Sequence, residues 1–145
     1  MIRIFTIFKS SIFTTALEPF LRSNGIEIIS SCNNSALALD YFKVINPDIV
    51  MMDLNWSVGT YSISGESLIQ QIQQHEPGVR IIAVTNFFDA QTVSRLKAQS
   101  VQGYFYRCMD NLLAEVKDCI ERVYEGEGFY ANTDASSLKT TTKLY

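Results

Sequence analysis

Ile49-Val50-Met51-Met52-Asp53 is the stretch that decides the fold, because four apolar residues run without interruption into a single carboxylate. The turn sequence Asn46-Pro47-Asp48 stands directly before it. A short, wholly apolar run after a turn predicts a strand that is buried on both faces. Such strands occur in parallel sheets that helices cover on both sides, so we expect an α/β fold.

Apolar strand patterns and amphipathic helix patterns alternate along the rest of the chain. They predict strands over residues 2–8, 27–30, 49–52, 79–85 and 103–106, and helices over about 11–22, 35–43, 65–74, 89–99 and 110–125. We therefore expect a three-layer, doubly wound fold with a five-stranded parallel sheet in the flavodoxin-like order 2-1-3-4-5 and five helices. Pro19 lies inside the first predicted helix and is expected to cost a backbone hydrogen bond or to kink the helix.

The 145-residue chain is long enough for one domain with one core. We place this domain at residues 1–126 and interpret the Ser- and Thr-rich residues 127–145 as a linker or tail, in which only Phe129 and Tyr130 pack. The net charge of −3 and the scattered basic residues argue against nucleic-acid binding by this segment. The three cysteines lack metal-binding spacing, and no apolar run reaches the roughly 18 residues of a membrane span. We therefore expect reduced thiols in a cytoplasmic protein without membrane contact.

Polar and charged residues follow the predicted strands at their carboxyl ends. Because the carboxyl ends of parallel strands meet at one edge, where open α/β sheets bind their ligands, we expect these residues to converge on one pocket. No GxGxxG sequence follows the first strand, which argues against a nucleotide or flavin enzyme. The residues at the strand ends are Phe8-Lys9-Ser10, Asp53, Thr85-Asn86 and Arg107.

Three of these segments carry a resemblance to a known family. Ile49–Asn55 is similar to the phosphoacceptor strand of response-regulator receiver domains, Ala83–Thr85 to their fourth strand and Gly103–Arg107 to their fifth. In this respect the chain resembles a CheY-like receiver of the LuxR/NarL type. The resemblance implies a role for each matching position. Asp53 is the phosphoacceptor position, Thr85 the switch hydroxyl and Tyr104 the switch aromatic, Arg107 replaces the Lys that pairs with the phosphoryl group, and Asn55 and Phe87 stand where phosphotransfer rates are tuned.

The chain departs from this family at the metal site. Receivers end the first strand with two acidic residues that hold Mg²⁺, whereas Phe8-Lys9 stands there, and no Asp or Glu precedes Glu18. Mg²⁺ requires oxygen ligands, so we expect its binding to be weak or absent and assign no metal or other cofactor. We expect Lys9 and Arg107 to pair with Asp53 and lock it in a charge-neutralised state. In the alternative, Lys9 points into solvent.

Other residues allow more ordinary interpretations. The loop 54–64 lacks the usual Pro, its Gly65 comes later than in receivers, and its Trp56 and Tyr61 are expected to pack on the sheet edge rather than to cover a small-molecule site. His75, the single histidine, is expected at the surface, which leaves no histidine-based zinc site or Ser-His-Asp site. Asp89 and Asp110 are expected to be helix N-caps, as is Asn34 or Ser35.

These observations favour an atypical receiver in two-component signal transduction, a protein-interaction and dimerisation module that is not an enzyme. We expect a homodimer through the predicted helix 89–99, strand 103–106 and helix 110–125, or through the helices 11–22 and 110–125. A histidine kinase or another signalling protein is an expected partner, and DNA only through an output domain after residue 145. Two alternatives remain open: a conventional receiver phosphorylated on Asp53 that controls transcription, and a small-ligand-sensing flavodoxin-like domain.

Overall fold

Six parallel strands form one sheet at the centre of the protein, in the order β2-β1-β3-β4-β5-β6. The computed structural model describes residues 1–59 and 62–132. Within these residues the predicted order 2-1-3-4-5 is confirmed, and a sixth strand is added at the β5 edge. The strands are β1 (Ile2–Ile7), β2 (Ile26–Cys32), β3 (Ile49–Asp53), β4 (Arg80–Thr85), β5 (Gly103–Tyr106) and β6 (Phe129–Tyr130).

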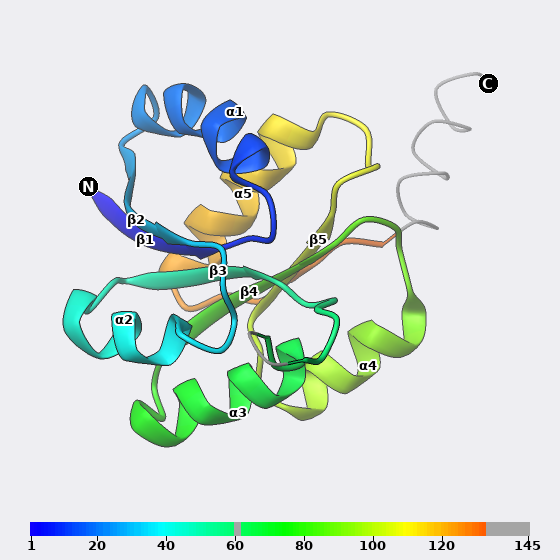
Figure 1. Ribbon diagram of the computed structural model, residues 1–145. Helices are drawn as coiled ribbons and strands as arrows, with labels where there is room; N and C mark the ends of the chain where they lie inside the picture. The colour runs from blue at the N-terminus through cyan, green and yellow to red at the C-terminus, as the bar shows by residue number, and fades with distance from the viewer. Residues whose placement is uncertain (60–61, 133–145) are drawn as a thin grey trace.

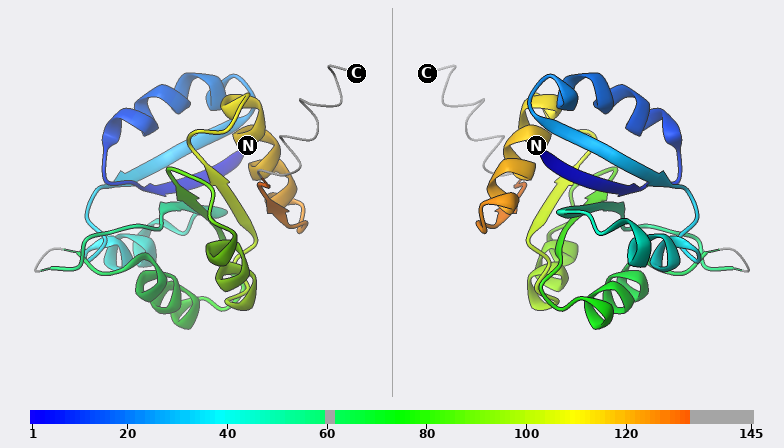
Figure 2. Two further views of the ribbon diagram at one scale, coloured as in Figure 1. Left: turned by 90° about the vertical axis from the view of Figure 1, so that its right-hand side faces the viewer. Right: turned by 90° about the vertical axis from the view of Figure 1, so that its left-hand side faces the viewer.

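Helices cover both faces of the sheet and give the predicted three layers. Helices α1 and α5 lie on one face, and α2, α3 and α4 lie on the other (Figures 1 and 2). In the described part of the chain, no helix is long and apolar enough to cross a membrane. The helices are α1 (Ser11–Arg22), α2 (Ala38–Ile45), α3 (Gly65–His75), α4 (Ala90–Ala98) and α5 (Leu112–Tyr124).

Strand β3 is the centre of the core, as its apolar run predicts. All of its residues are buried, and Ile49 to Met52 expose no surface at all. The strand pairs with β1 on one side and β4 on the other, with Met51 aligned to Thr6 and Ile82. The carboxylate of Asp53 is therefore held at the edge where β1, β4 and β5 also end.

Strand β6 lies inside the segment predicted as linker or tail, so the sheet continues past residue 126 and the prediction of five strands was one short. Phe129 donates its backbone N–H to the Gln102 carbonyl (3.0 Å), and Ala131 donates to the Tyr104 carbonyl (2.9 Å). A two-residue strand shows no periodicity, so the sequence pattern does not reveal it. Phe129 and Tyr130 pack against the core as predicted, but Ala131 is buried there too, so the prediction that only these two residues pack was wrong. Residues 133–145 of the predicted tail lie outside the described residues.

The expected helix caps are confirmed at some helices and wrong at others. Asp89 caps α4, because its carboxylate accepts from the Gln91 N–H. Asp110 does not cap α5, because the next residue, Asn111, adopts a positive φ of 53° and the helix begins after it. Asn34 accepts from two backbone N–H groups in a turn, but α2 itself begins only at Ala38. Helix α1 continues through Pro19 to Arg22.

Gly65 allows α3 to begin against the loop that follows β3. A Cβ atom at Gly65 would lie 2.2 Å from the backbone oxygen of Leu54, which cannot move aside as a flexible side chain can. We expect Gly65→Ala to lower the free energy of unfolding by about 1–3 kcal/mol in urea titrations. Gly78→Ala is the matched control, since a Cβ there meets no atom within 4 Å. Equal stability of the two variants would contradict this packing.

Candidate functional site

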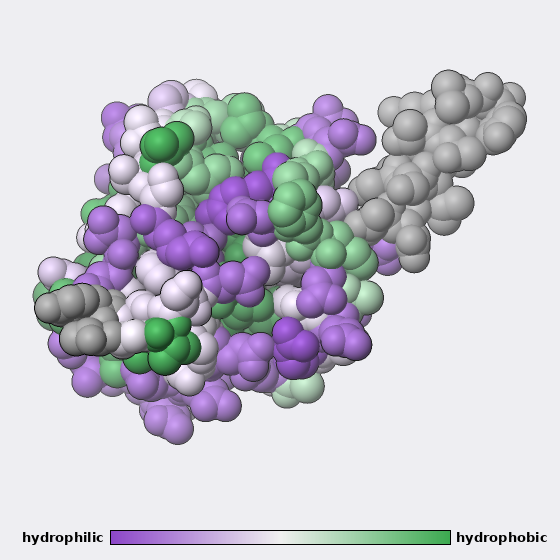
Figure 3. Space-filling model, turned by 45° about the vertical axis from the view of Figure 1, so that its right-hand side comes forward, coloured by the Kyte–Doolittle hydropathy of each residue, from purple (hydrophilic) through white to green (hydrophobic). Residues whose placement is uncertain are grey.

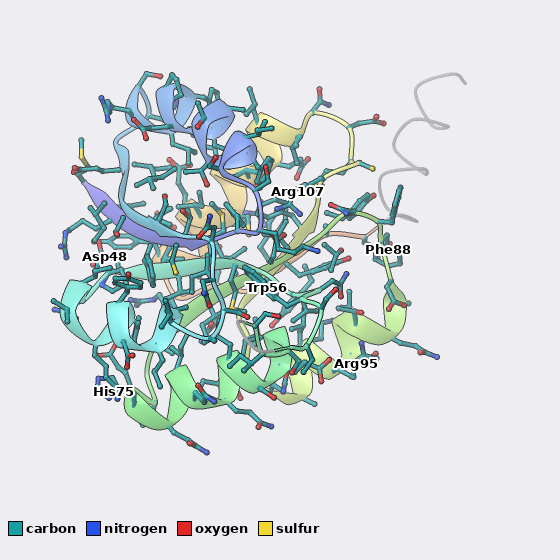
Figure 4. The ribbon with its side chains drawn as sticks, in the orientation of Figure 1. Asp48, Trp56, His75, Phe88, Arg95 and Arg107 are labelled. Atoms are coloured by element: carbon teal, nitrogen blue, oxygen red, sulfur yellow. The ribbon has the colours of Figure 1, made fainter. Side chains whose placement is uncertain are left out.

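Asp53 and Arg107 form an ion pair at the carboxyl edge of the sheet. Arg107 Nη2 lies 2.6 Å from Asp53 Oδ1, and the side chain of Asp53 is only 5% exposed. Arg107 leaves the end of β5, and Trp56, in the loop after β3, lies at the same edge (Figure 4). The predicted convergence of Asp53 and Arg107 is confirmed. A carboxylate so deeply buried needs a counter-charge, and Arg107 supplies it.

Two aromatic rings and the backbone fix the position of Arg107. Its guanidinium carbon lies 4.4 Å from the ring centroid of Phe13 and 5.3 Å from that of Phe8. Its backbone N–H donates to the Thr85 carbonyl (2.9 Å), and Nη1 donates to Asn86 Oδ1 (3.2 Å). The planar guanidinium therefore stacks on aromatic rings while it binds a carboxylate, which an ammonium group cannot do as well.

Lys9 contacts Asp53 through its backbone and not through its ammonium group. The Lys9 N–H donates to Asp53 Oδ2 (2.8 Å), and the exposed side chain makes no ion pair with Asp53 in the described structure. The expected Lys9–Asp53 pair is therefore wrong, and the alternative of a solvent-facing Lys9 holds. β1 ends at Ile7, and Lys9 lies in the bend that follows the buried Phe8, where its side chain is exposed.

The donor set at this site does not fit Mg²⁺. Both oxygens of Asp53 are engaged, one by Arg107 and the other by the Lys9 N–H. The positions that carry carboxylates in other receivers hold a buried phenyl ring and an exposed ammonium group. Among the described residues, no three His, Cys, Asp or Glu side chains come together in a way that could hold a metal ion. Mg²⁺ prefers an octahedron of oxygen atoms, and one occupied carboxylate cannot supply it.

The space beside Asp53 is small. Asp53, Asn55 and Thr85 border a cavity of about 10 Å³, which has room for roughly one water molecule. A wider, mostly apolar groove of about 450 Å³ adjoins Asp53 and runs along Ile12 and Phe13 of α1.

Thr85 and Tyr104 are hydrogen-bonded to each other. The Thr85 hydroxyl lies 2.7 Å from the Tyr104 hydroxyl and donates to the Phe87 carbonyl (2.8 Å). Tyr104 is fully buried, and this burial raises the pKa of its hydroxyl. The two residues expected to form the switch are therefore in contact, with the aromatic ring in its inward position.

The remaining predicted site residues lie at or near this edge. The Phe87 ring is 72% exposed, although its carbonyl accepts from Thr85. Trp56 is partly buried and donates from Nε1 to the Asp53 carbonyl (2.7 Å), in agreement with the packing expected of it, whereas Tyr61 lies outside the described residues. His75 is exposed near the opposite edge, as expected (Figure 4).

Asn86 lies at this site as the strand ends predict, and Phe13 completes the site although its sequence position did not point to this role. Phe13 packs against the core from α1, and the same ring also lies under the Arg107 guanidinium. Its place in the first turn of a helix that follows the β1 end was the available signal.

Around this site the surface combines a hydrophilic band with hydrophobic surface above it (Figure 3).

Comparisons with known proteins agree with this geometry. The sequence pattern of the response regulator receiver domain matches residues 9–117. The transcriptional regulatory protein LnrK of Bacillus subtilis is 26% identical over 110 residues, which are 75% of this chain and 48% of LnrK. The chain spans about half the length of the first curated relatives it matches.

Solved structures share the fold at low sequence identity. A LuxR-family two-component response regulator from Aurantimonas superposes with a TM-score of 0.79 at 19% identity, covering 99% of this chain and 98% of the other. A structure of RcsB dimers bound to DNA superposes with a TM-score of 0.77 at 14% identity, covering 90% of this chain and 64% of the other.

A parallel CheY-like sheet with an aspartate at the end of β3 and a cation at the end of β5 defines the receiver class of α/β domains. The chain belongs to the response regulator receiver domain family and is the receiver domain of a two-component response regulator. The predicted resemblance is thereby confirmed.

We expect the Arg107–Asp53 pair to show a measurable coupling energy. In a double-mutant cycle with Arg107→Ala and Asp53→Asn, the coupling should be about 1–3 kcal/mol in urea unfolding, less than for a fully buried pair because the Arg107 side chain is 21% exposed. Arg107→Lys keeps the charge but loses the fork, so its stability should fall between wild type and Arg107→Ala. A coupling near zero would show that the pair is incidental.

Stability should fall at alkaline pH partly through Tyr104. Burial raises its pKa in the folded state, so its contribution is fully present below the unfolded pKa of about 10 and is lost as pH rises through the folded pKa. Urea unfolding of wild type and Tyr104→Phe across this range should show a shallower decline for the variant. The exposed Tyr41→Phe is the control and should follow wild type. Identical pH profiles of all three proteins would refute this.

Proposed function

We propose that this receiver is a regulatory protein-interaction module whose state is set without Mg²⁺-dependent phosphorylation of Asp53. The observation that carries the proposal is the ion pair between Asp53 and Arg107, with Phe8 and Lys9 at the metal position. It is not an enzyme and uses no cofactor in this proposal.

Phosphoryl transfer to a carboxylate requires a free nucleophilic oxygen and positive charge to offset the developing charge. Both Asp53 oxygens already accept hydrogen bonds or ion-pair contacts. To free one of them, Arg107 would have to leave its carboxylate and the ring of Phe13 together. The charge that would attract a phosphoryl donor is thus already used to neutralise Asp53.

The contact between Thr85 and Tyr104 supports a receiver held in one state. Thr85 is engaged by the Tyr104 hydroxyl and the Phe87 carbonyl, so its hydroxyl is not turned toward Asp53. In the proposed module, a binding partner rather than a phosphoryl group changes this arrangement. The partner is a histidine kinase or another signalling protein, and the module works in the cytoplasm.

For self-association we favour the surface of α1 and α5 over that of α4, β5 and α5. Strand β6 already pairs with the β5 edge, and Lys97 of α4 lies 4.8 Å from the Tyr130 ring centroid, so residues of the same chain occupy part of the second surface. Ile12 of α1 and Leu113 of α5 are exposed apolar residues on the first. RcsB forms dimers on DNA, and we extend dimerisation to this chain, with DNA contacted only through an output domain in a longer protein.

A conventional receiver phosphorylated on Asp53 is the second candidate. Asp53, Thr85 and Tyr104 all lie at the positions that such a mechanism needs, and the name of LnrK, a transcriptional regulator, favours control of transcription. The two candidates differ in whether Arg107 can be displaced by a phosphoryl donor.

The test is exposure to acetyl phosphate and phosphoramidate with Mg²⁺, read by intact mass. We expect no gain of a phosphoryl group, and no effect of Mg²⁺ on the fluorescence of Trp56, the single tryptophan, which is bonded to the Asp53 carbonyl. The double variant Lys9→Asp, Arg107→Lys returns the family residue types at two of the three departing positions, with Phe8 left in place, and should gain a Mg²⁺-dependent fluorescence change.

Asp53→Asn is the control for the site of any modification. A mass gain in wild type that requires both Asp53 and Mg²⁺ would replace the proposal with the conventional mechanism. A double variant that folds but shows no response to Mg²⁺ would mean that the two substitutions alone do not explain the loss of the metal site.

A further inference from the structure

A second cavity, of about 380 Å³, lies between the start of α1, the ends of β1 and β2, and the turn before α2. Its volume is within the range of small-molecule pockets, roughly 300–1,000 Å³. It shares none of its lining residues with the groove beside Asp53. Six residues that characterise its lining are Phe8, Ser11, Thr14, Ser31, Asn33 and Tyr41.

Thr14 gives this cavity an unused hydrogen-bonding group. The residue is only 8% exposed, and no hydrogen bond of its hydroxyl is found within the described part of the chain. The hydroxyl oxygen is not sealed from the cavity, because Gln99 Oε1 is the one fully buried, unpaired side-chain oxygen or nitrogen among the described residues. Because the lining of the cavity includes Thr14, this hydroxyl is available to a molecule inside.

The polar groups of the lining are uncharged. Hydroxyl and amide groups come from Ser11, Asn33 and Tyr41, and the lining contains no Lys, Arg, His, Asp or Glu. Cys32 also lines the cavity, and burial raises the pKa of its thiol, so this group is neutral at physiological pH. A phosphate, a carboxylate or an amine would find no counter-charge here, which separates this cavity from the Asp53 site.

Apolar surface completes the lining. Phe8 is buried beneath the cavity, while Leu37 and Tyr41 are about half exposed at α2. Flat apolar surface beside unpaired hydroxyl and amide groups suits a molecule that has both ring faces and hydroxyl groups.

We propose that this cavity binds an uncharged, hydroxyl-rich small molecule of roughly monosaccharide size. The Thr14 hydroxyl pairs with a ligand hydroxyl, and Tyr41 and Leu37 contact the apolar face of the ligand ring.

Phe8 connects this site to the Asp53 site. Its ring lines the cavity and also lies beneath the Arg107 guanidinium. A ligand that presses on Phe8 therefore acts on the residue that neutralises Asp53. Binding itself is independent of the proposed phosphate-free function, and only the transmission to Arg107 rests on it.

The experiment titrates ¹⁵N-labelled protein with D-glucose, D-ribose and N-acetylglucosamine, without any phosphate donor, and follows amide shifts by NMR. D-glucuronate and glucose 6-phosphate are the charged counterparts. We expect at least one neutral probe to cause saturable shifts at Thr14, Cys32 and Asn33, and the charged counterparts to cause none. The Arg107 Nε–Hε signal should move with the same saturation curve.

Thr14→Val removes the hydroxyl and keeps the side-chain shape, and should weaken binding by about three- to tenfold. Thr15→Val is the matched control on the exposed side of α1 and should bind as wild type does. Absence of saturable shifts with every neutral probe, equal shifts with charged probes, or unchanged affinity in Thr14→Val would each overturn the site. Shifts in the cavity without movement of Arg107 would overturn the transmission alone, and phosphorylation of Asp53 would bear on the proposed function and not on this cavity.

Discussion

The buried carboxylate of Asp53 is the constraint around which this receiver is arranged. It stands at the end of a strand with no exposed surface, so its charge must be balanced inside the protein. Arg107 balances it through one oxygen and the Lys9 N–H binds the other. The guanidinium is in turn held by the rings of Phe8 and Phe13. The aromatic ring that stands where receivers have a carboxylate thus also supports the guanidinium that neutralises Asp53.

The same arrangement continues through the sheet to the last strand. Arg107 donates its N–H to the Thr85 carbonyl, the Thr85 hydroxyl contacts Tyr104, and the Tyr104 carbonyl accepts from Ala131 beside β6. These contacts form a continuous path of backbone and hydroxyl groups from Asp53 to the sheet edge. Physical contact of this kind is a route for coupling, and its energy is a matter for double-mutant cycles.

Sequence reasoning reached the architecture because it rests on burial. The apolar run of β3 implies a sheet covered on both faces, and that sheet implies that Asp53 and Arg107 meet. Sequence reasoning was wrong where local geometry, and not burial, determines the position of a residue. The Lys9 side chain was expected to pair with Asp53, but Lys9 lies in the bend after β1 and its side chain faces solvent. The two-residue β6 has no pattern to recognise, and the αL conformation of Asn111, which displaces the start of α5 from Asp110, depends on tertiary packing.

Strand β6 also decides where mechanical load enters the domain. The last described residues lie along the sheet edge, because Phe129 and Ala131 donate to the Gln102 and Tyr104 carbonyls and the Tyr130 hydroxyl donates to the Val101 carbonyl. β5 and β6 are parallel, so tension along β6 loads these hydrogen bonds in shear, the direction in which paired strands resist best. A pull along β6 is thus delivered to the strand that carries Tyr104.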